Sequence, residues 1–299
     1  MSRFVRPGRV FIAALFVVGL VACGGDESSM DSVVATTTVA SAPSSAPPAS
    51  DAAPQPAQEP AQVLRILVTN DDGVGADGID AIVQGLLTLE NVEVTVVAPL
   101  ENQSGTGGST TDGTLVVTDA TTKSGYPAKA VAGFPADTIV WAIDQGGIDF
   151  VPDLVVSGIN LGQNYSAEII PVSGTVGAAR AAAARGIPSV AISQGVAAAV
   201  DFPSGVEAGL EWVREHIEEL LARKDGDQVD SLTNINIPSC APGTSIRGTV
   251  EVPVASLAGS DYNTQDCAST AEATSDVTGF QSGFVTISAL PVKGAPFPD

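Results

Sequence analysis

The stretch ILVTNDDGVGADGI, residues 66–79, constrains the fold of this chain more than any other. A short aliphatic run, Ile66 to Val68, is soon followed by two adjacent carboxylates, Asp71 and Asp72, and glycines precede an apolar pattern of helical spacing. This order predicts a buried strand, a turn and a helix, as in parallel α/β sheets. Such sheets bind ligands at the carboxyl ends of their strands. Because neighbouring carboxylates repel each other, the position predicts a cation site with oxygen ligands.

Strands and helices alternate through the rest of the folded part. The strands that we expect are at residues 92–98, 114–118, 128–131, 153–157, 189–193 and 233–237. The helices that we expect are at residues 79–87, 135–144, 175–185 and 206–221. Because strand and helix follow one another in this rhythm, we expect an α/β fold. It should be a three-layer Rossmann-like sandwich with a mostly parallel sheet and a C-terminal extension or β-hairpin.

The N-terminal part is typical of an exported protein. Residues 1–22 carry arginines and then an apolar run that is too short to span a bilayer, as in a secretory signal peptide. The run ends in Leu-Val-Ala-Cys-Gly, which resembles a bacterial lipobox with Cys23 as the lipidated residue. The alternative is an ordinary signal peptide with an incidental cysteine. Residues 23–62, rich in Ala, Ser and Pro, are expected to form a disordered tether, and residues 63–299 one folded domain.

These segments predict an extracytoplasmic protein that is lipid-anchored to a bacterial membrane, either periplasmic or at the cell surface. The formal net charge of −21 argues against a nucleic-acid polymer as partner, because binding one needs clustered Lys and Arg. Once Cys23 is assigned to the anchor, Cys240 and Cys267 remain. An even pair in an oxidising compartment favours a disulfide, and the alternative is two free buried thiols.

Further oxygen donors follow neighbouring predicted strands. Ser104 lies in the Gly/Ser-rich loop after the second strand, and Asn160 comes just after the strand DLVVS. With Asp71 and Asp72 they form a set of carboxylate, hydroxyl and amide oxygens. Such hard donors suit magnesium, manganese or calcium better than zinc.

Several other chemistries are excluded by missing residues. The one histidine, His216, is expected on the solvent-exposed face of a helix, which removes Ser-His-Asp catalysis and histidine-rich zinc sites. No phosphate-binding Gly-x-x-x-x-Gly-Lys-Ser/Thr loop occurs. A haloacid-dehalogenase-type phosphatase needs Asp-x-Asp after the first strand, and Asn70-Asp71-Asp72 lacks that spacing. Metal-assisted hydrolysis and a binding protein remain.

Several ordered motifs resemble the SurE survival-protein family. They are ILVTNDDGVGADGI, ENQSGTGGS, GFPAD, PDLVVSGINLGQNYSAEIIPVSGTVGAAR, LTNINIP and GFVTISALP. The resemblance covers about residues 66–291 and marks residues 63–299 as a phosphatase domain. It implies metal-dependent hydrolysis of nucleoside 5′- and 3′-monophosphates to nucleoside and phosphate. It also implies one divalent cation per subunit, with magnesium or manganese favoured over calcium, and a homodimer or homotetramer.

The resemblance also assigns roles to single residues. The four metal-ligand positions of the family correspond to Asp71, Asp72, Ser104 and Asn160, and positions around the phosphate correspond to Asn102, Ser173, Gly174 and Thr175. We expect Asp71 and Asp72 to be catalytic, with Asp71 orienting or deprotonating the attacking water. The N–H groups that open the helix at Ser173–Thr175 suit phosphate oxygens. Ser173 or Thr175 can equally serve as an N-cap, and the two roles are compatible.

Some positions depart from the family pattern. Phe134 replaces a threonine, Pro171-Val172 replaces an aromatic residue before Ser173, and residues 251–278 resemble the family little. These changes fall near the place where a base or sugar would sit. The predicted enzyme therefore has one alternative, a non-catalytic phosphate- or nucleotide-binding lipoprotein with the same fold.

Overall fold

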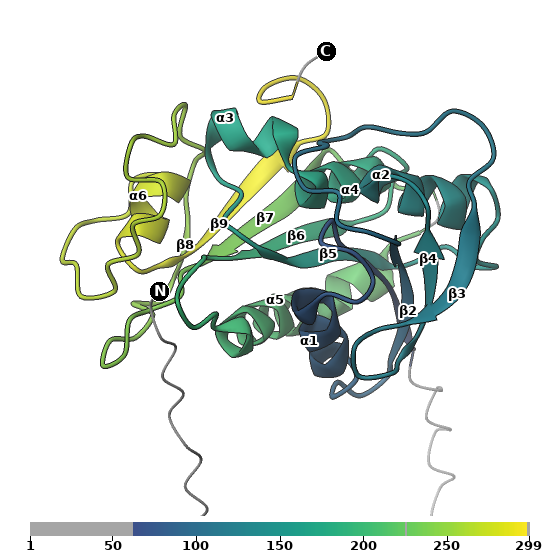
Figure 1. The fold of residues 1–299 in the computed structure, drawn as a ribbon, viewed down its shortest axis with the longest axis horizontal. Coiled ribbons are helices and arrows are strands. Elements are labelled where there is room, and N and C mark those ends of the chain that lie inside the picture. The colour runs from purple at the N-terminus through teal and green to yellow at the C-terminus, as the bar shows by residue number, and fades with distance from the viewer. Residues whose placement is uncertain (1–61, 225, 298–299) are drawn as a thin grey trace, which may run out of the picture. The chain divides into compact units, whose positions relative to one another are not determined.

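A single nine-stranded sheet, in the order β3-β4-β2-β1-β5-β6-β7-β9-β8, organises the described part of the protein (Figure 1). The computed structural model describes residues 62–224 and 226–297. The predicted signal peptide, Cys23 and all but the last residue of the predicted tether lie outside these residues.

The strands and helices have the following bounds. The strands are β1 (Leu64–Thr69), β2 (Val92–Pro99), β3 (Val117–Thr121), β4 (Pro127–Val131), β5 (Leu154–Leu161), β6 (Ser189–Gln194), β7 (Ser231–Ile237), β8 (Thr249–Glu251) and β9 (Val285–Pro291). The α-helices are α1 (Asp77–Leu86), α2 (Pro135–Ile139), α3 (Ser166–Ile169), α4 (Gly174–Ala183), α5 (Phe202–Ala222) and α6 (Asp276–Gln281). The short helices are the π-helix η1 (Val140–Asp144) and the 3₁₀-helix η2 (Ile170–Val172).

The predicted parallel sheet is present, with antiparallel pairs toward its two edges. Neighbours from β4 through β2, β1, β5 and β6 to β7 are parallel, whereas β3 is antiparallel to β4 and β9 is antiparallel to β7. The edge strand β8 is parallel to β9, so these two strands do not form a hairpin. Residues 252–284 connect them and include α6. We call this segment the C-terminal extension.

Helices cover both faces of the sheet and give the three predicted layers. Figure 1 shows α1 and α5 on one face and α2 and α4 on the other. Five of the six residues of β1 are buried, as expected for a central strand that is covered on both sides. Helix α4 is rich in alanine, and Ala178, Ala179 and Ala182 are fully buried. Its small side chains let the helix axis lie close to the sheet.

Four predicted elements differ from those observed. The strand expected at residues 153–157 continues as β5 to Leu161, so Asn160 lies within the strand and not after it. The helix expected at residues 135–144 is α2 followed by η1, so its second half has π-helical hydrogen bonding. The strand expected at residues 114–118 is shifted to β3. Helix α5 starts at Phe202, earlier than expected, because Asp201 caps it and accepts a hydrogen bond from the Ser204 N–H.

His216 is partly buried rather than fully solvated. Its ring stacks on Trp212, one turn earlier, with 4.2 Å between the ring centroids, and its Nδ1 lies 2.8 Å from the Trp212 carbonyl oxygen. Residues four apart on a helix are neighbours, so the aromatic partner is supplied locally. The described hydrogen bonds of this histidine are within its own helix.

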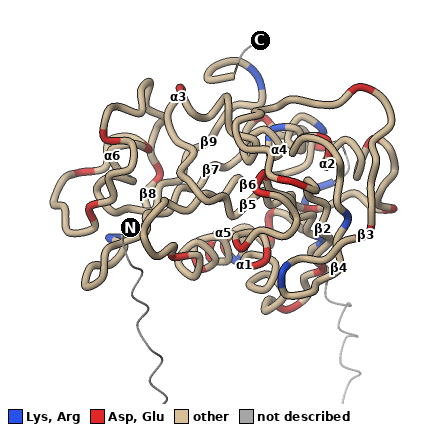
Figure 2. The backbone as a smooth tube through the Cα atoms, in the orientation of Figure 1, with Lys and Arg blue, Asp and Glu red and all other residues tan. Residues whose placement is uncertain are grey.

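Asp and Glu residues are widely spread along the described backbone (Figure 2). In the part of the chain that the structure describes, no helix has the length and apolar character needed to cross a bilayer. Cys240 and Cys267 are joined in a disulfide, with 5.6 Å between their Cα atoms. This bond ties the C-terminal extension to the loop that follows β7.

Candidate active site

Asp72 joins two loops at the carboxyl edge of the sheet. The Asn102 Nδ2 donates to Asp72 Oδ1 at 3.1 Å, from the loop after β2. The Leu161 backbone N–H donates to Asp72 Oδ2, also at 3.1 Å, from the end of β5. The loops after β1 and β2 and the end of β5 therefore meet at this carboxylate, as the strand-end argument predicts.

Asp71 is buried against the start of α4. It is 3 % exposed, and the Thr175 hydroxyl donates to its Oδ1 at 2.6 Å. A Cβ atom on Gly174 would lie only 2.8 Å from Asp71 Cβ and 3.0 Å from Asp71 Oδ2. Glycine is therefore required at the first position of α4, because any side chain there would displace the carboxylate.

The other two predicted ligands come from the neighbouring loop and strand. Ser104 is exposed, and its backbone N–H donates to Asn102 Oδ1 at 3.0 Å. Asn160 is buried at the end of β5, and its Nδ2 donates to the Gly162 carbonyl oxygen at 2.6 Å. That bond uses the amide nitrogen of Asn160 and leaves the amide oxygen, the atom that binds hard cations, out of the interaction.

The loop after β2 is packed directly on α4. The Gly107 N–H donates to the Val172 carbonyl oxygen at 3.0 Å. A Cβ on Gly177 would lie 2.1 Å from the Gly107 carbonyl oxygen, so the helix presents bare backbone at this contact. The Gly/Ser-rich composition of the loop is thus explained by close approach of two backbones.

The predicted phosphate-binding residues divide into two groups. Ser173 is the N-cap of α4 and accepts from the Val176 N–H at 3.2 Å, so the N-cap interpretation holds for its side chain. The Thr175 side chain is fully buried and bonded to Asp71, so it supports the carboxylate and does not face a phosphate. The N–H groups of Gly174 and Thr175 belong to the first turn, which helical hydrogen bonds leave unpaired.

A buried polar network behind Thr175 was not predicted. The Asn164 side chain donates to the hydroxyls of Ser193, at 2.9 Å, and Thr175, at 3.4 Å. Its backbone N–H donates to Asn236 Oδ1 at 2.6 Å, and its carbonyl oxygen accepts from Asn234 and Asn236. One sequence signal was available. Asn234 and Asn236 alternate with apolar residues in a buried strand, which places both on one face.

Burial makes the acid pair electrostatically unfavourable. Desolvation raises the pKa of Asp71 to about 6, an effect that Thr175 opposes and the Asp72 charge reinforces. Desolvation also raises the pKa of Asp72, against the hydrogen bonds from Leu161 and Asn102. The ion pairs found among the described residues involve neither acid. A cation bound at this position would supply the missing positive charge.

The donor set fits a hard divalent cation. Among the described residues, no group of three or more His, Cys, Asp or Glu side chains is placed to hold a metal ion, so a site here would have to include amide and hydroxyl oxygens. The candidate site offers two carboxylates, an amide oxygen and a hydroxyl instead. Magnesium, manganese and calcium accept such all-oxygen sets.

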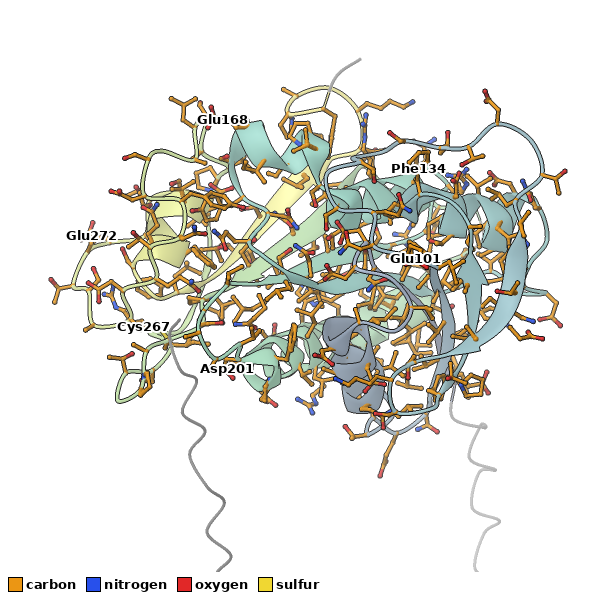
Figure 3. All side chains as sticks on the ribbon, in the orientation of Figure 1. Glu101, Phe134, Glu168, Asp201, Cys267 and Glu272 are labelled. Atoms are coloured by element: carbon orange, nitrogen blue, oxygen red, sulfur yellow. A yellow bond between two sulfur atoms is a disulfide. The ribbon has the colours of Figure 1, made fainter. Side chains whose placement is uncertain are left out.

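Phe134, one of the departures from the family pattern, precedes α2 (Figure 3), and the next residue, Pro135, lies beside Gly174 at the start of α4. Its backbone N–H donates to Asp137 Oδ2 at 2.8 Å. The fully buried Asp137 also accepts from the N–H and hydroxyl of Thr111. The capping role at this position is carried by the Asp137 carboxylate and a backbone N–H, so it does not need the threonine hydroxyl.

Comparison with known proteins identifies the family of this domain. The family model described as "Survival protein SurE" matches residues 66–263. A 5′-nucleotidase SurE from Methanocella arvoryzae is 39% identical over 183 residues, covering 59% of this chain and 68% of the relative. The 5′-nucleotidase SurE of Methanococcoides burtonii is 32% identical over 250 residues, covering 76% of this chain and 92% of the relative. The crystal structure of the SurE protein from Aquifex aeolicus superposes with a TM-score of 0.61 at 27% identity, covering 77% of this chain and 94% of that one. The chain therefore belongs to the SurE survival-protein family.

Proposed function

We propose that this protein is a metal-dependent 5′-nucleotidase, which hydrolyses nucleoside 5′-monophosphates, and also 3′-monophosphates, to nucleoside and phosphate. The observation that carries the proposal is the pair Asp71 and Asp72. Asp71 is buried against the first turn of α4, Asp72 is half-buried, and the ion pairs found among the described residues involve neither. The relatives named 5′-nucleotidase support the same activity.

The cation would be held by Asp71, Asp72, Ser104 and Asn160. When bound, it would lower the pKa of water and polarise a phosphoryl oxygen. Magnesium or manganese is our choice, with calcium next, because the donors are all oxygens and the protein supplies only four of them. The side-chain and backbone donors around Asp72 hold this carboxylate in one orientation, which reduces the reorganisation needed to form the site.

The chain's own groups position the phosphate and the water. The N–H groups of Gly174 and Thr175, together with the positive end of the α4 dipole, suit phosphate oxygens. Asn102 lies beside Asp72 and can donate to the same phosphate from the opposite loop. Asp71 is our candidate for orienting or deprotonating the attacking water, because its carboxylate lies against the first turn of α4, where the phosphate would be held.

A metal screen with defined phosphate esters tests this function. The purified protein should release inorganic phosphate from adenosine 5′-monophosphate, EDTA should abolish the release, and added manganese or magnesium should restore it. Binding of the nucleotide without any phosphate release, under every metal, would contradict the enzyme and favour the binding-protein alternative. Comparison of 5′- and 3′-monophosphates in the same assay defines the position of the hydrolysed ester.

The anchor and the assembly are further parts of the proposal. The lipobox-like sequence before Cys23 supports a lipid anchor outside the cytoplasm of a bacterium. The wild-type protein should then sediment with membranes, and Cys23→Ser should release it into the soluble fraction. Family membership supports a homodimer or homotetramer. Light scattering of the purified protein should give a mass of two or four subunits, and a monomer would contradict this part.

A further inference from the structure

A groove of about 970 Å³ lies at the carboxyl ends of β6 and β7. Its walls come from the loops after these two strands, the start of α5 and the C-terminal extension. Lining residues include Ala197, Val200, Pro203, Pro242, Ile246 and Asn263. This volume is within the range of small-molecule sites, and the edge of the sheet is the one that carries the acid pair.

The groove is next to the candidate active site along the sheet edge, because β6, whose following loop lines the groove, pairs with the end of β5 at Asn160 and Leu161. The point where a Gly162 side chain would begin is 3.7 Å from Asn160 Nδ2 and 3.9 Å from Val196 Cγ2. The side chains of Asn160 and Val196 are therefore both near Gly162, which has no side chain of its own to separate them. Ala197, the next residue after Val196, already lines the groove.

Exposed apolar side chains lie between the candidate active site and the groove. Leu161 is 45% exposed and Val196 is 48% exposed, although each follows a buried residue. Leu161 is the residue whose backbone N–H holds Asp72. An apolar surface therefore starts one residue from the predicted metal ligands and leads toward the groove.

The charge of the groove favours a neutral occupant. Of the residues that line it, only Asp201 is charged, and none is basic. The Asp201 carboxylate is already engaged, because it accepts from the N–H and hydroxyl of Ser204 at the start of α5. Figure 3 shows Asp201 and Cys267 at the same end of the molecule. A second phosphate would find no positive partner here, whereas a flat uncharged ring would keep apolar contacts.

The outer wall of the groove is fixed in place by several bonds. The Gln265 Oε1 accepts from the Ser239 N–H at 2.6 Å, and its Nε2 donates to the Val196 carbonyl oxygen at 2.8 Å. The disulfide between Cys240 and Cys267 joins the same two loops. A wall held at both sides is already formed before a ligand arrives, which reduces the cost of ordering it.

We propose that this groove binds the nucleobase of the substrate, whose phosphate lies at the acid pair. The sugar lies over Leu161, and the base enters over Val196, lies against the apolar lining of the groove and meets Asn263 at its polar edge. The Asn263 Oδ1 accepts from Gln163 at 3.1 Å, which fixes the amide and leaves its nitrogen for the base. The inference rests on the proposed nucleotidase function and adds the part of the protein that distinguishes a nucleotide from another phosphate ester.

A matched pair of substrates tests this site. Adenosine 5′-monophosphate and ribose 5-phosphate carry the same phosphate ester, and only the first has a base. In the wild-type protein, kcat/KM should be higher for the nucleotide. Val196→Asp should lower the ratio of the two kcat/KM values about tenfold, through KM, because the apolar contact with the base is lost. Asn263→Ala should lower it less. Leu257→Ser, which changes a still more exposed apolar residue in the C-terminal extension, should leave the ratio unchanged.

The possible outcomes distinguish failure of the base site from failure of the proposed nucleotidase function. A selective loss for the nucleotide, with weaker inhibition by free adenosine in Val196→Asp, supports the base site. Turnover of both esters with the same ratio in wild type, Val196→Asp and Asn263→Ala overturns the base site and leaves the nucleotidase intact. No turnover of either ester with any metal overturns the proposed function, and the base site with it.

Discussion

Two regions lie along one edge of the sheet and are held by different means. Around the acid pair, contacts are made by buried polar side chains and by glycines that allow backbones to touch, as at Gly174. The C-terminal extension is instead held by the disulfide and by an aromatic cluster, in which Tyr165 packs edge-on against Tyr262 and Phe280 with centroids 5.3 and 5.2 Å away. The first region therefore tolerates little change of side-chain size, whereas the second can vary in sequence around a few anchors.

The loop after β5 connects these regions by alternating residues. Asn164 donates to the network behind Thr175, on the active-site side. Its neighbours on both sides bond to the extension. Gln163 Nε2 and the Tyr165 hydroxyl both donate to the Tyr262 carbonyl oxygen, at 2.7 and 2.5 Å. The comparison of the two regions shows that one short loop can position both the candidate active site and the C-terminal extension.

The largest effect is expected from neutralising the acid pair. Asp71→Asn or Asp72→Asn should lower kcat by about 10²–10³-fold, since each removes a charged group aimed at the reacting centre. The stability of the metal-free protein should not fall, because burial makes the Asp71 carboxylate unfavourable and the amide removes that charge. Phosphate release and chemical unfolding in EDTA measure the two effects. Unchanged turnover in both variants would break the assignment of this region as the active site.

The next effect is expected at Thr175. Thr175→Val removes the hydroxyl that donates to Asp71 and accepts from Asn164 and keeps a side chain of similar shape. The affinity for manganese should fall about 10–100-fold, as for other residues that orient a metal ligand. Thr175→Ser keeps the hydroxyl and is the matched control, so it should bind manganese nearly as the wild type does. Calorimetric titration measures both, and equal affinities in the Val and Ser variants would contradict a positioning role.

The residues around the acid pair and Thr175 show which features of the site can be predicted from the sequence. Asp71, Asp72 and Asn160 were predicted to converge because parallel strands deliver their carboxyl ends to one edge, and the structure brings the segments that carry them together. The role of Asn164 was not predictable in this way, because it depends on the path of an irregular loop. The packing of Tyr262 was missed for the same reason. Residues 252–284 carry little periodic pattern, and their fold is set by long-range contacts.

A smaller effect on the active site is expected from pH. The pKa of Asp71 is raised from 3.8 to about 6 in the folded state, so the proton is held more tightly there than in the unfolded chain. The metal-free protein should therefore be most stable below about pH 4 with respect to this group and should lose that contribution as pH rises through about 6. A cation must displace the same proton, so manganese affinity should fall up to about tenfold per pH unit below 6. Manganese titrations and unfolding measurements at pH 5 and 7 test this. In Asp71→Asn, the fall in stability with pH and the rise in manganese affinity with pH should both disappear.

The smallest effect on the acid pair is expected from opening the disulfide, although its effect on stability is large. The double variant Cys240→Ser, Cys267→Ser releases a loop with a sequence separation of 27 residues. The chain-entropy relation then gives a loss of about 3–4 kcal/mol in the free energy of unfolding. Turnover of ribose 5-phosphate should change by less than about twofold, because hydrogen bonds around Thr175 and Asp72, and not the extension, hold the ligands. If manganese affinity falls together with stability, the two regions are energetically coupled. If stability alone falls, the C-terminal extension is energetically independent of the metal site.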